Sequence, residues 1–276
     1  MSPLTGKVIA ITGAARGIGF AIAQACMADG ARISISDIDE SALREAADRL
    51  GAHHAARLDV TDPDGFGRYL NQVEAAIGPL DALVNNAGVM PTGPLLDLDD
   101  AMIRRIMEIN SLGMIYGTKR ALELMTPRGR GHVVNICSAM GEMAVPGLAV
   151  YNASKAAAVL FTDSTRLEHR ATGVRVSAVL PGTVATELAA GLTNPPGIRV
   201  TTPEQVADAV VATLASEKSR PRVYVPALWG ALVRGQSLAP KGIHEAFMRL
   251  LGSDTAVLRP KDPAARASYL DRVRKS

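Results

Sequence analysis

The chain has 276 residues, 47% of them hydrophobic, and a formal net charge of +3. This length suits one large α/β domain or two small ones. No apolar run approaches the ~18–20 residues that span a bilayer, and the start of the chain lacks the basic and apolar regions of a secretory signal. We therefore expect a cytoplasmic protein.

The two cysteines lie in apolar segments and the five histidines show no metal-ligand spacing, so we expect neither a disulfide framework nor a metal site. Charge is unevenly spread. Residues 217–276 carry 12 Lys and Arg against 5 Asp and Glu, whereas the rest of the chain is mildly acidic. This basic tail has few aromatic residues and no recognised motif, which argues against nucleic-acid binding.

Apolar runs alternate with helical stretches along most of the chain. Strands are predicted at 7–12, 31–36, 54–59, 81–85, 131–137, 174–180 and 222–225. Helices are predicted at about 17–29, 39–50, 63–77, 99–125, 149–171 and 203–216. This pattern predicts an α/β fold with a Rossmann-type, doubly wound parallel sheet of about seven strands. Residues 1–226 are expected to form one catalytic domain, and residues 227–276 a helical extension packed on it.

The first predicted strand runs into a glycine-rich turn. The turn comprises Thr12, Gly13, Ala14, Ala15, Arg16, Gly17, Ile18 and Gly19. Glycine lets the backbone approach a phosphate, and the free N–H groups of the first helical turn bind its negative charge. The turn therefore predicts a pyrophosphate cradle, although glycines also join strands to helices where no ligand binds.

Asp37 ends the second predicted strand. In a dinucleotide-binding fold, an acid at this point accepts hydrogen bonds from the adenosine ribose and repels a 2′-phosphate. This favours NAD over NADP, whereas Arg16 offers a charge that suits a 2′-phosphate. The alternative role for Asp37 is that of a helix N-cap, with Asp39 as a competitor.

Two further strand ends carry groups suited to a cofactor that lies across the sheet edge. After the third strand, Asp59 is placed to bond an adenine amino group and Val60 to pack on the ring. After the fourth strand come Asn86, Ala87 and Gly88, which are also ordinary turn formers.

Ser138 ends the fifth predicted strand, and Tyr151 and Lys155 follow in a predicted helix. Because they are four positions apart, Tyr151 and Lys155 share one helix face. A phenol has a pKa of about 10 and is a poor base near pH 7. An ammonium within about 4–6 Å favours the phenolate and lowers that pKa. The pair therefore suits proton exchange with an alcohol or carbonyl oxygen, to which Ser138 is placed to donate a hydrogen bond.

Together these motifs resemble the short-chain dehydrogenase/reductase family. The resemblance extends over residues 7 to about 225 and rests on Thr12-Gly13-x-x-x-Gly17-x-Gly19, Asp59, Asn86-Ala87-Gly88, Asn110, Ser138, Tyr151-x-x-x-Lys155, Pro181-Gly182 and Thr186. It implies that Tyr151 is the general acid/base and that Lys155 also bonds the nicotinamide ribose. It further implies that Ser138 orients the substrate oxygen and that Asn110 holds a water of a proton relay.

The resemblance also implies that the segment after the sixth strand touches the nicotinamide amide, and that copies of the chain form a homodimer or homotetramer through the helices at 99–125 and 149–171. The cofactor residues predicted in all are Gly13, Arg16, Gly17, Ile18, Gly19, Asp37, Asp59, Val60, Asn86, Ala87, Gly88, Tyr151, Lys155, Pro181, Gly182, Val184 and Thr186.

The positions expected to wall the substrate site are apolar and include no Arg or Lys. They are Val89, Met90, Pro91, Met140, Met143, Val145, Leu148, Leu188 and Leu192. The predicted substrate contacts are Ser138, Met140, Met143, Tyr151 and Leu188. A hydrophobic secondary alcohol or its ketone therefore fits better than a small anion, and steroid-like, terpenoid, retinoid-like and fatty acyl compounds all stay open.

The tail combines apolar and basic residues. An apolar stripe formed by Ile243, Ala246, Phe247, Leu250 and Leu251 predicts a helix. A last helix is predicted to begin at Asp262-Pro263, as N-cap and first helical residue. We expect a lid or a subunit contact. A second hypothesis is peripheral docking on an anionic membrane or an acidic acyl carrier.

The function predicted first is that of an NAD-dependent oxidoreductase that interconverts a hydrophobic secondary alcohol and its ketone. The alternatives are an NADP-dependent ketone or 3-oxoacyl reductase, a non-catalytic NAD(H)-binding protein, and an epimerase or dehydratase on the same fold. The complete set of Asn110, Ser138, Tyr151 and Lys155 argues against a protein that only binds the cofactor. A methyltransferase of Rossmann type has no use for the Tyr151 and Lys155 pair.

Overall fold

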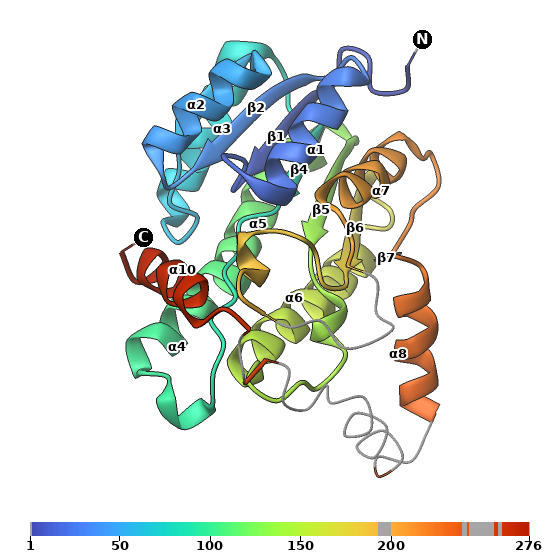
Figure 1. The fold of residues 1–276 in the computed structure, drawn as a ribbon. Coiled ribbons are helices and arrows are strands. Elements are labelled where there is room, and N and C mark those ends of the chain that lie inside the picture. Colours follow the sequence, from blue (N-terminus) through green and yellow to red (C-terminus); the bar gives the residue numbers. More distant parts are fainter. Residues whose placement is uncertain (1, 193–199, 239–241, 243–256, 259–260, 276) are drawn as a thin grey trace.

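The computed structural model describes residues 2–192, 200–238, 242, 257–258 and 261–275. Seven strands form one parallel sheet in the order β3-β2-β1-β4-β5-β6-β7 (Figure 1). They are β1 (Val8–Thr12), β2 (Arg32–Asp37), β3 (His54–Arg57), β4 (Ala82–Asn85), β5 (Gly131–Ile136), β6 (Val174–Pro181) and β7 (Arg222–Val225). The strand order reverses between β1 and β4, which places a ligand crevice outside the carboxyl ends of these strands.

Helices connect the strands and cover both faces of the sheet, as predicted for a doubly wound α/β fold. They are α1 (Gly17–Ala28), α2 (Glu40–Leu50), α3 (Pro63–Ile77), α4 (Asp100–Met107), α5 (Met114–Met125), α6 (Ala149–Glu168), α7 (Pro203–Ala215), α8 (Leu228–Leu238) and α10 (Pro263–Lys275). Shorter helical turns are η1 (Leu95–Asp97), η2 (Glu108–Gly113), η3 (Thr126–Arg128), η4 (Ala139–Gly141) and η5 (Glu187–Ala189).

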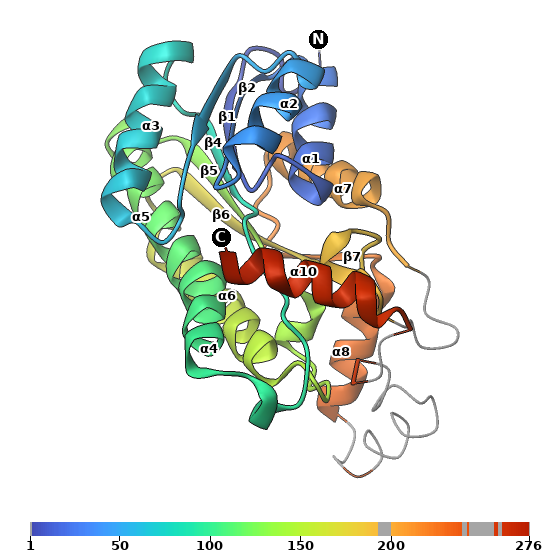
Figure 2. The ribbon, with the colours of Figure 1, turned by 60° about the vertical axis from the view of Figure 1, so that its left-hand side comes forward.

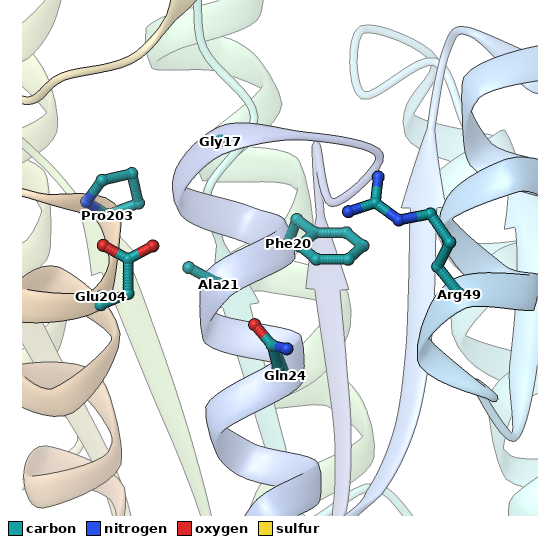
Figure 3. Close-up of a pocket in the computed structure, with 7 residues that line it drawn as sticks. All are labelled: Gly17, Phe20, Ala21, Gln24, Arg49, Pro203 and Glu204. Carbon is teal, nitrogen blue, oxygen red and sulfur yellow. The ribbon is translucent and has the colours of Figure 1, made fainter.

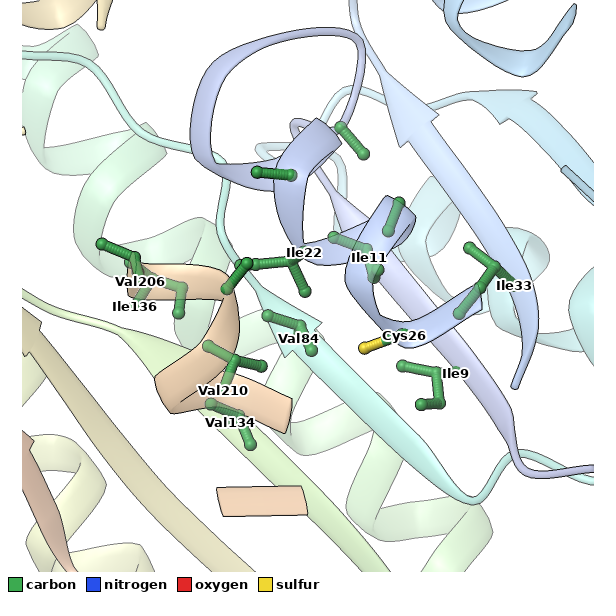
Figure 4. Packing of buried hydrophobic residues seen from close by; sticks show 14 of the residues in the cluster. Ile9, Ile11, Ile22, Cys26, Ile33, Val84, Val134, Ile136, Val206 and Val210 are labelled. Carbon is green, nitrogen blue, oxygen red and sulfur yellow. The ribbon is translucent and has the colours of Figure 1, made fainter. Parts of the chain in front are cut away.

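Alternate residues of each strand point to opposite faces of the sheet. In β1, Ile9 and Ile11 join a core with α1, α2 and α7, whereas Val8 and Ala10 join a second core with α3 and α5. Figure 2 shows these two helical layers on either side of the strands, and Figure 4 shows the first core from close by. Full burial of one Ile or Val side chain stabilises the fold by about 1.5–3 kcal/mol relative to exposure. The two cores therefore hold the strands in place, and with them the edge of the sheet at which the strands end.

The helix predicted at 99–125 is interrupted in its middle. The helix α4 ends at Met107, a π-helical turn (η2) follows, and α5 begins at Met114. Gly113 packs so closely on Val60 that a Cβ atom there would lie 2.8 Å from a Val60 methyl carbon. Such turns are rare and frequently mark functional sites. The other predicted elements end within a few residues of their observed bounds.

The tail contributes α8 and α10 to the described residues. As predicted, Asp262 caps α10, because its Oδ1 atom accepts hydrogen bonds from the N–H groups of Ala264 and Ala265 at 3.1 and 3.0 Å. The predicted stripe at 243–251 lies outside the described residues. In the part of the chain that the structure describes, no helix is long and apolar enough to cross a membrane.

Candidate active site

The glycine-rich turn runs from β1 into α1 and approaches the loop after β4. A Cβ atom on Gly13 would lie 2.8 Å from the Cα atom of Ala87, and one on Gly19 would overlap the carbonyl oxygen of Gly13. Only glycine permits this close approach of two backbones. The predicted residues Gly13, Gly17 and Gly19 therefore shape the turn itself.

The first turn of α1 is left without a side-chain cap. Arg16 occupies its N-cap position, no side chain accepts a hydrogen bond there, and the first turn holds no acidic residue. By contrast, Asp39, Asp62, Asp99 and Thr202 cap α2, α3, α4 and α7. The N–H groups of the first turn and the positive end of the helix dipole thus suit an anion such as a pyrophosphate.

Asn86 and Thr12 hold the glycine-rich turn in place. The side-chain amide of Asn86 donates to the carbonyl oxygens of Thr12 and Gly13, at 2.9 Å each. The hydroxyl of Thr12 accepts from the N–H groups of Asn86 and Ala87 at 3.0 and 3.1 Å. Asn86, predicted as a cofactor contact, thus has both amide protons committed to the turn. Thr12 stabilises the same turn together with Asn86, a role that its place in the glycine-rich motif did not predict.

The two candidates for cofactor selection lie next to each other. Asp37 accepts hydrogen bonds from the N–H groups of Ala15 and Asp39, at 3.2 and 3.1 Å. Asp39 rather than Asp37 caps α2, since it accepts from the N–H of Ala42 at 3.1 Å. Asp37 is therefore not the N-cap of α2, and its carboxylate faces the glycine-rich turn.

Arg16 is paired with two carboxylates. Its Nη2 atom lies 2.5 Å from Oδ2 of Asp39, and its Nη1 atom lies 3.6 Å from Oε2 of Glu187. Burial lowers the pKa of Arg16, but the bond to Asp39 and the charge of Glu187 outweigh it and raise that pKa. The pKa of Asp39 is lowered, first by the N–H of Ala42 and then by Arg16.

The remaining predicted adenosine contacts follow β3. Asp59 lies two residues beyond the end of this strand, and one of its carboxylate oxygens accepts from the N–H and the hydroxyl of Thr61 at 2.9 and 2.7 Å. Val60 is buried against the π-turn η2. Val60 thus packs mainly on protein, and the second oxygen of Asp59 has no partner within the described residues.

Ser138, Tyr151 and Lys155 come together at the carboxyl end of β5. All three side chains are buried, at 4–6% exposed. The hydroxyl of Ser138 lies close enough to the phenol of Tyr151 to act on the pKa of that phenol. One helical turn from Tyr151, the ammonium of Lys155 donates to the carbonyl oxygen of Ile136 at 3.0 Å. The spacing predicted from the sequence therefore does bring these side chains to one place.

Burial dominates the proton affinities of this group. It raises the pKa of Tyr151 to about 12, although the nearby hydroxyl of Ser138 acts to lower it. Burial also lowers the pKa of Lys155. The sequence predicted a lowered pKa for this phenol, whereas the structure raises it, because loss of hydration on burial outweighs the effect of Ser138.

Asn110 lies in the π-turn η2 and is fully buried. Its Oδ1 atom accepts from the N–H of Val89 at 2.8 Å, and its Nδ2 atom donates to the carbonyl of Val89 and to the hydroxyl of Ser154. A Cβ atom on Gly88 would lie 3.2 Å from Oδ1 of Asn110 and 3.5 Å from Nζ of Lys155. The turn thus brings Asn110 beside Lys155, with its side chain fully engaged by protein.

The loop after β6 folds back over the glycine-rich turn. A Cβ atom on Gly17 would lie 3.4 Å from the methyl carbon of Thr186. Val184 is buried and pairs with Thr201. At the start of the loop, the carbonyl of Pro181 accepts from the hydroxyl of Ser138 at 3.5 Å, and Gly182 lies under the indole of Trp229. These predicted cofactor residues therefore border both the turn and the Ser138 site.

A family model described as short chain dehydrogenase matches residues 7–196, more than half of the chain. The chain belongs to the short-chain dehydrogenase family. A cis-4-hydroxycyclohexanecarboxylate dehydrogenase of Sinomonas cyclohexanicum is 38% identical over 224 residues, which cover 76% of this chain and 90% of the relative. A 2-(S)-hydroxypropyl-CoM dehydrogenase of Xanthobacter autotrophicus is 36% identical, covering 78% and 91%. A cyclopentanol dehydrogenase of Comamonas testosteroni is 31% identical, covering 79% and 94%.

This short-chain dehydrogenase is an oxidoreductase that acts on CH–OH groups. The structure brings one further residue to the predicted substrate positions. The sequence did not single out Arg266 of α10, whose side chain donates to the carbonyl oxygens of Met90 and Leu188. Met140 and Met143 are half-buried beside η4, where the N–H of Met140 donates to the hydroxyl of Ser138 at 3.1 Å.

A separate cavity of about 580 Å³ lies between α1, α2 and α7 (Figure 3). It is lined by Gly17, Phe20, Ala21, Gln24, Arg49, Pro203 and Glu204. Arg49 lies over the ring of Phe20 at 4.6 Å. Ser138, Tyr151 and Lys155 take no part in this cavity, so the dehydrogenase site is assigned from the side chains at the strand ends and not from the cavity.

Proposed function

We propose that this dehydrogenase interconverts a small hydrophobic secondary alcohol and its ketone with NAD(H), and that Tyr151 exchanges the proton. The observation that carries the proposal is that Ser138, Tyr151 and Lys155 are all buried together at the carboxyl end of β5, with Lys155 one helical turn from Tyr151 on α6. Two relatives are named as acting on hydroxycyclohexanecarboxylate and cyclopentanol, which favours a secondary alcohol on a single small ring as the substrate.

The cofactor supplies the hydride when it is bound. In the reducing direction, the phenol of Tyr151 donates its proton to the carbonyl oxygen, and the hydroxyl of Ser138 donates a hydrogen bond to the same oxygen. The phenolate that remains gains from the positive charge of Lys155. In the oxidising direction, the same phenolate accepts the proton of the alcohol. The side chain of Asn110 is engaged by Val89 and Ser154, so its role in the proposed site is to hold the loop at Val89 beside Lys155.

The charges near the glycine-rich turn favour NAD over NADP. Asp37 faces the turn, and the guanidinium that would meet a 2′-phosphate is held by Asp39 and Glu187. The uncapped first turn of α1 fits the pyrophosphate. To reach Arg16, a 2′-phosphate would have to displace the carboxylates of Asp39 and Glu187. It would also lie near the negative charge of Asp37, and both effects oppose the binding of NADP.

The test is Tyr151→Phe, which removes one hydroxyl and keeps the ring. We expect turnover of cyclohexanol to fall by about 10²–10⁴-fold, while NADH binding, followed by fluorescence, stays within about twofold. Tyr116→Phe on α5 is the matched control and should keep full activity. Titration of the unmutated protein should show tighter binding of NADH than of NADPH. Tight NADH binding with no turnover of any alcohol would instead indicate a non-catalytic NAD(H)-binding protein, and turnover without net change in NADH an epimerase or dehydratase.

We also infer that copies of the chain associate through α6. Leu160 and Leu167 lie seven residues apart on one face of this helix and are 66% and 51% exposed. Burial of this stripe against a second copy would remove apolar surface from water. Sedimentation velocity should show a dimer or a larger assembly, and Leu160→Glu should shift the distribution to monomer. A monomer in the unmutated protein would overturn this inference.

A further inference from the structure

The helix α10 presents one face to the body of the protein. Arg266, Tyr269 and Val273 follow the spacing of that face and are 3–5% exposed. Ser268 and Asp271 lie on the exposed side. Figure 2 shows α10 crossing in front of the sheet, next to α4 and α6. The helix lies beyond residues 7–196, which match the family model.

Arg266 joins two loops that flank the site. Its Nε atom donates to the hydroxyl of Thr92 at 2.9 Å, its Nη1 atom to the carbonyl of Leu188 at 2.8 Å, and its Nη2 atom to the carbonyl of Met90. Among the residues that the structure describes, no carboxylate lies within ion-pair distance of Arg266. A buried guanidinium is costly without partners. Displacement of α10 would break all three bonds together.

Tyr269 brings the same helix close to the reacting groups. Its hydroxyl oxygen accepts from the N–H of Met90 at 2.8 Å. Met90 stands two residues after Gly88, which lies between Asn110 and Lys155. The ring of Tyr269 belongs to one apolar cluster with Val89, Val150 and Leu188. The phenols of Tyr269 and Tyr151 also interact electrostatically.

We propose that Arg266 and Tyr269 form a latch that holds α10 as a wall of the substrate pocket and thereby restricts this dehydrogenase to compact alcohols. This restriction to compact alcohols rests on the proposed function of the protein as an alcohol dehydrogenase. We expect a substrate that extends past Met90 and Leu188 to displace α10 and break the latch, and a single-ring alcohol to bind with the helix in place. Arg266 and Tyr269 are thus positioning residues that act through Met90 and Leu188.

A series of cyclic alcohols from cyclopentanol to cyclododecanol tests the proposal. For the unmutated enzyme, kcat/KM should fall steeply beyond rings of about eight carbons. In Arg266→Ala, the ratio of kcat/KM for cyclododecanol to that for cyclohexanol should rise at least tenfold. In Tyr269→Phe, KM for cyclohexanol should rise about fivefold, the effect of one lost hydrogen bond, with kcat within twofold. Ser268→Ala, on the exposed side of α10, is the control and should leave both values unchanged.

Hydrogen exchange at the amide of Met90 provides a readout that does not depend on activity. Tyr269→Phe should accelerate this exchange about fivefold, and Ser268→Ala should leave it unchanged. If Arg266→Ala does not fold, Arg266→Lys replaces it, since it keeps the charge but not the planar fork. An unchanged ring-size ratio or an unchanged exchange rate would overturn the latch. If the unmutated protein oxidises no cyclic alcohol, the proposed function fails, and the latch is then judged by the exchange at Met90 alone.

Discussion

Arg16 in the glycine-rich turn is bound to Asp39 at the start of α2, with 2.5 Å between Nη2 and Oδ2. Arg16 also lies 3.6 Å from Glu187, which in turn pairs with Arg272 of α10 at 2.5 Å. A row of alternating charges thus runs from the second strand to the last helix. Because the guanidinium is shared by two carboxylates, its presence in the turn does not by itself indicate NADP.

Removal of the negative charges around Arg16 should change the cofactor preference. In the double variant Asp37→Ser/Asp39→Ser, we expect NADPH to bind at least about tenfold more tightly and NADH less tightly, since Arg16 becomes available to a 2′-phosphate. Serine keeps the cap of α2, so the helix should survive. Dissociation constants from fluorescence titration measure the effect. Asp62→Ser at the cap of α3 is the matched control, and a preference unchanged by the double variant would contradict the assignment.

The pH dependence should differ between the two directions of the reaction. Oxidation requires the phenolate of Tyr151, and burial raises the pKa of Tyr151 to about 12. The value of kcat/KM for alcohol oxidation should therefore rise about tenfold per pH unit until the phenol in the complex with NAD is ionised. Ketone reduction uses the protonated phenol and should be flat across the same range. Initial rates in both directions test this, and a maximum near pH 7 for oxidation would indicate another base.

His132 should make the fold sensitive to acid. Burial, helped by the charge of Arg175, lowers the pKa of His132 to about 3, while its Nε2 atom lies 2.9 Å from the hydroxyl of Ser177. The neutral form is favoured in the folded state. Its contribution to stability is therefore fully present above the unfolded pKa of about 6.5 and is lost as pH falls toward 3.

The free energy of unfolding should accordingly fall by up to about 1.4 kcal/mol per pH unit between pH 6 and pH 3 on account of His132. Urea unfolding at a series of pH values measures this slope. His132→Gln should reduce the slope even where it lowers stability overall, and the exposed His53→Gln should not. An equal slope in His132→Gln would show that other groups cause the acid sensitivity.

Gly191 anchors the start of α10. Its φ angle is +73°, its carbonyl accepts from the N–H of Asp262 at 3.2 Å, and a Cβ atom there would overlap the carbonyl oxygen of Asp262. Gly191→Ala should therefore release α10, seen as faster hydrogen exchange in 261–275, and destabilise the fold by more than about 1 kcal/mol. Gly235→Ala on α8 is the control, because a Cβ atom at Gly235 would meet nothing within 4 Å. This variant should be neutral or more stable than the unmutated protein by up to about 1 kcal/mol. Equal exchange in the two variants would contradict the anchor.

Local patterns in the sequence determined much of this protein. Apolar runs set the seven strands because a parallel sheet covered on both faces needs continuous hydrophobic segments. The spacing of Tyr151 and Lys155 placed them on one helix face, and the strand end at Ser138 brought the third group to them. The identity of Asp262 and Pro263 also predicted the start of α10, since cap and first-turn preferences act within a few residues.

Only the tertiary structure decided the contacts between distant segments. The helix predicted at 99–125 contains the π-turn around Asn110, because Asn110 is held by Val89 and Ser154 from other elements. Tyr269 meets Met90 across 179 positions of the chain. The sequence predicted where the last helix begins, but not that Arg266 and Tyr269 lie on its buried face. Periodicity reports which face of an element is buried, whereas its partner depends on how all the elements pack.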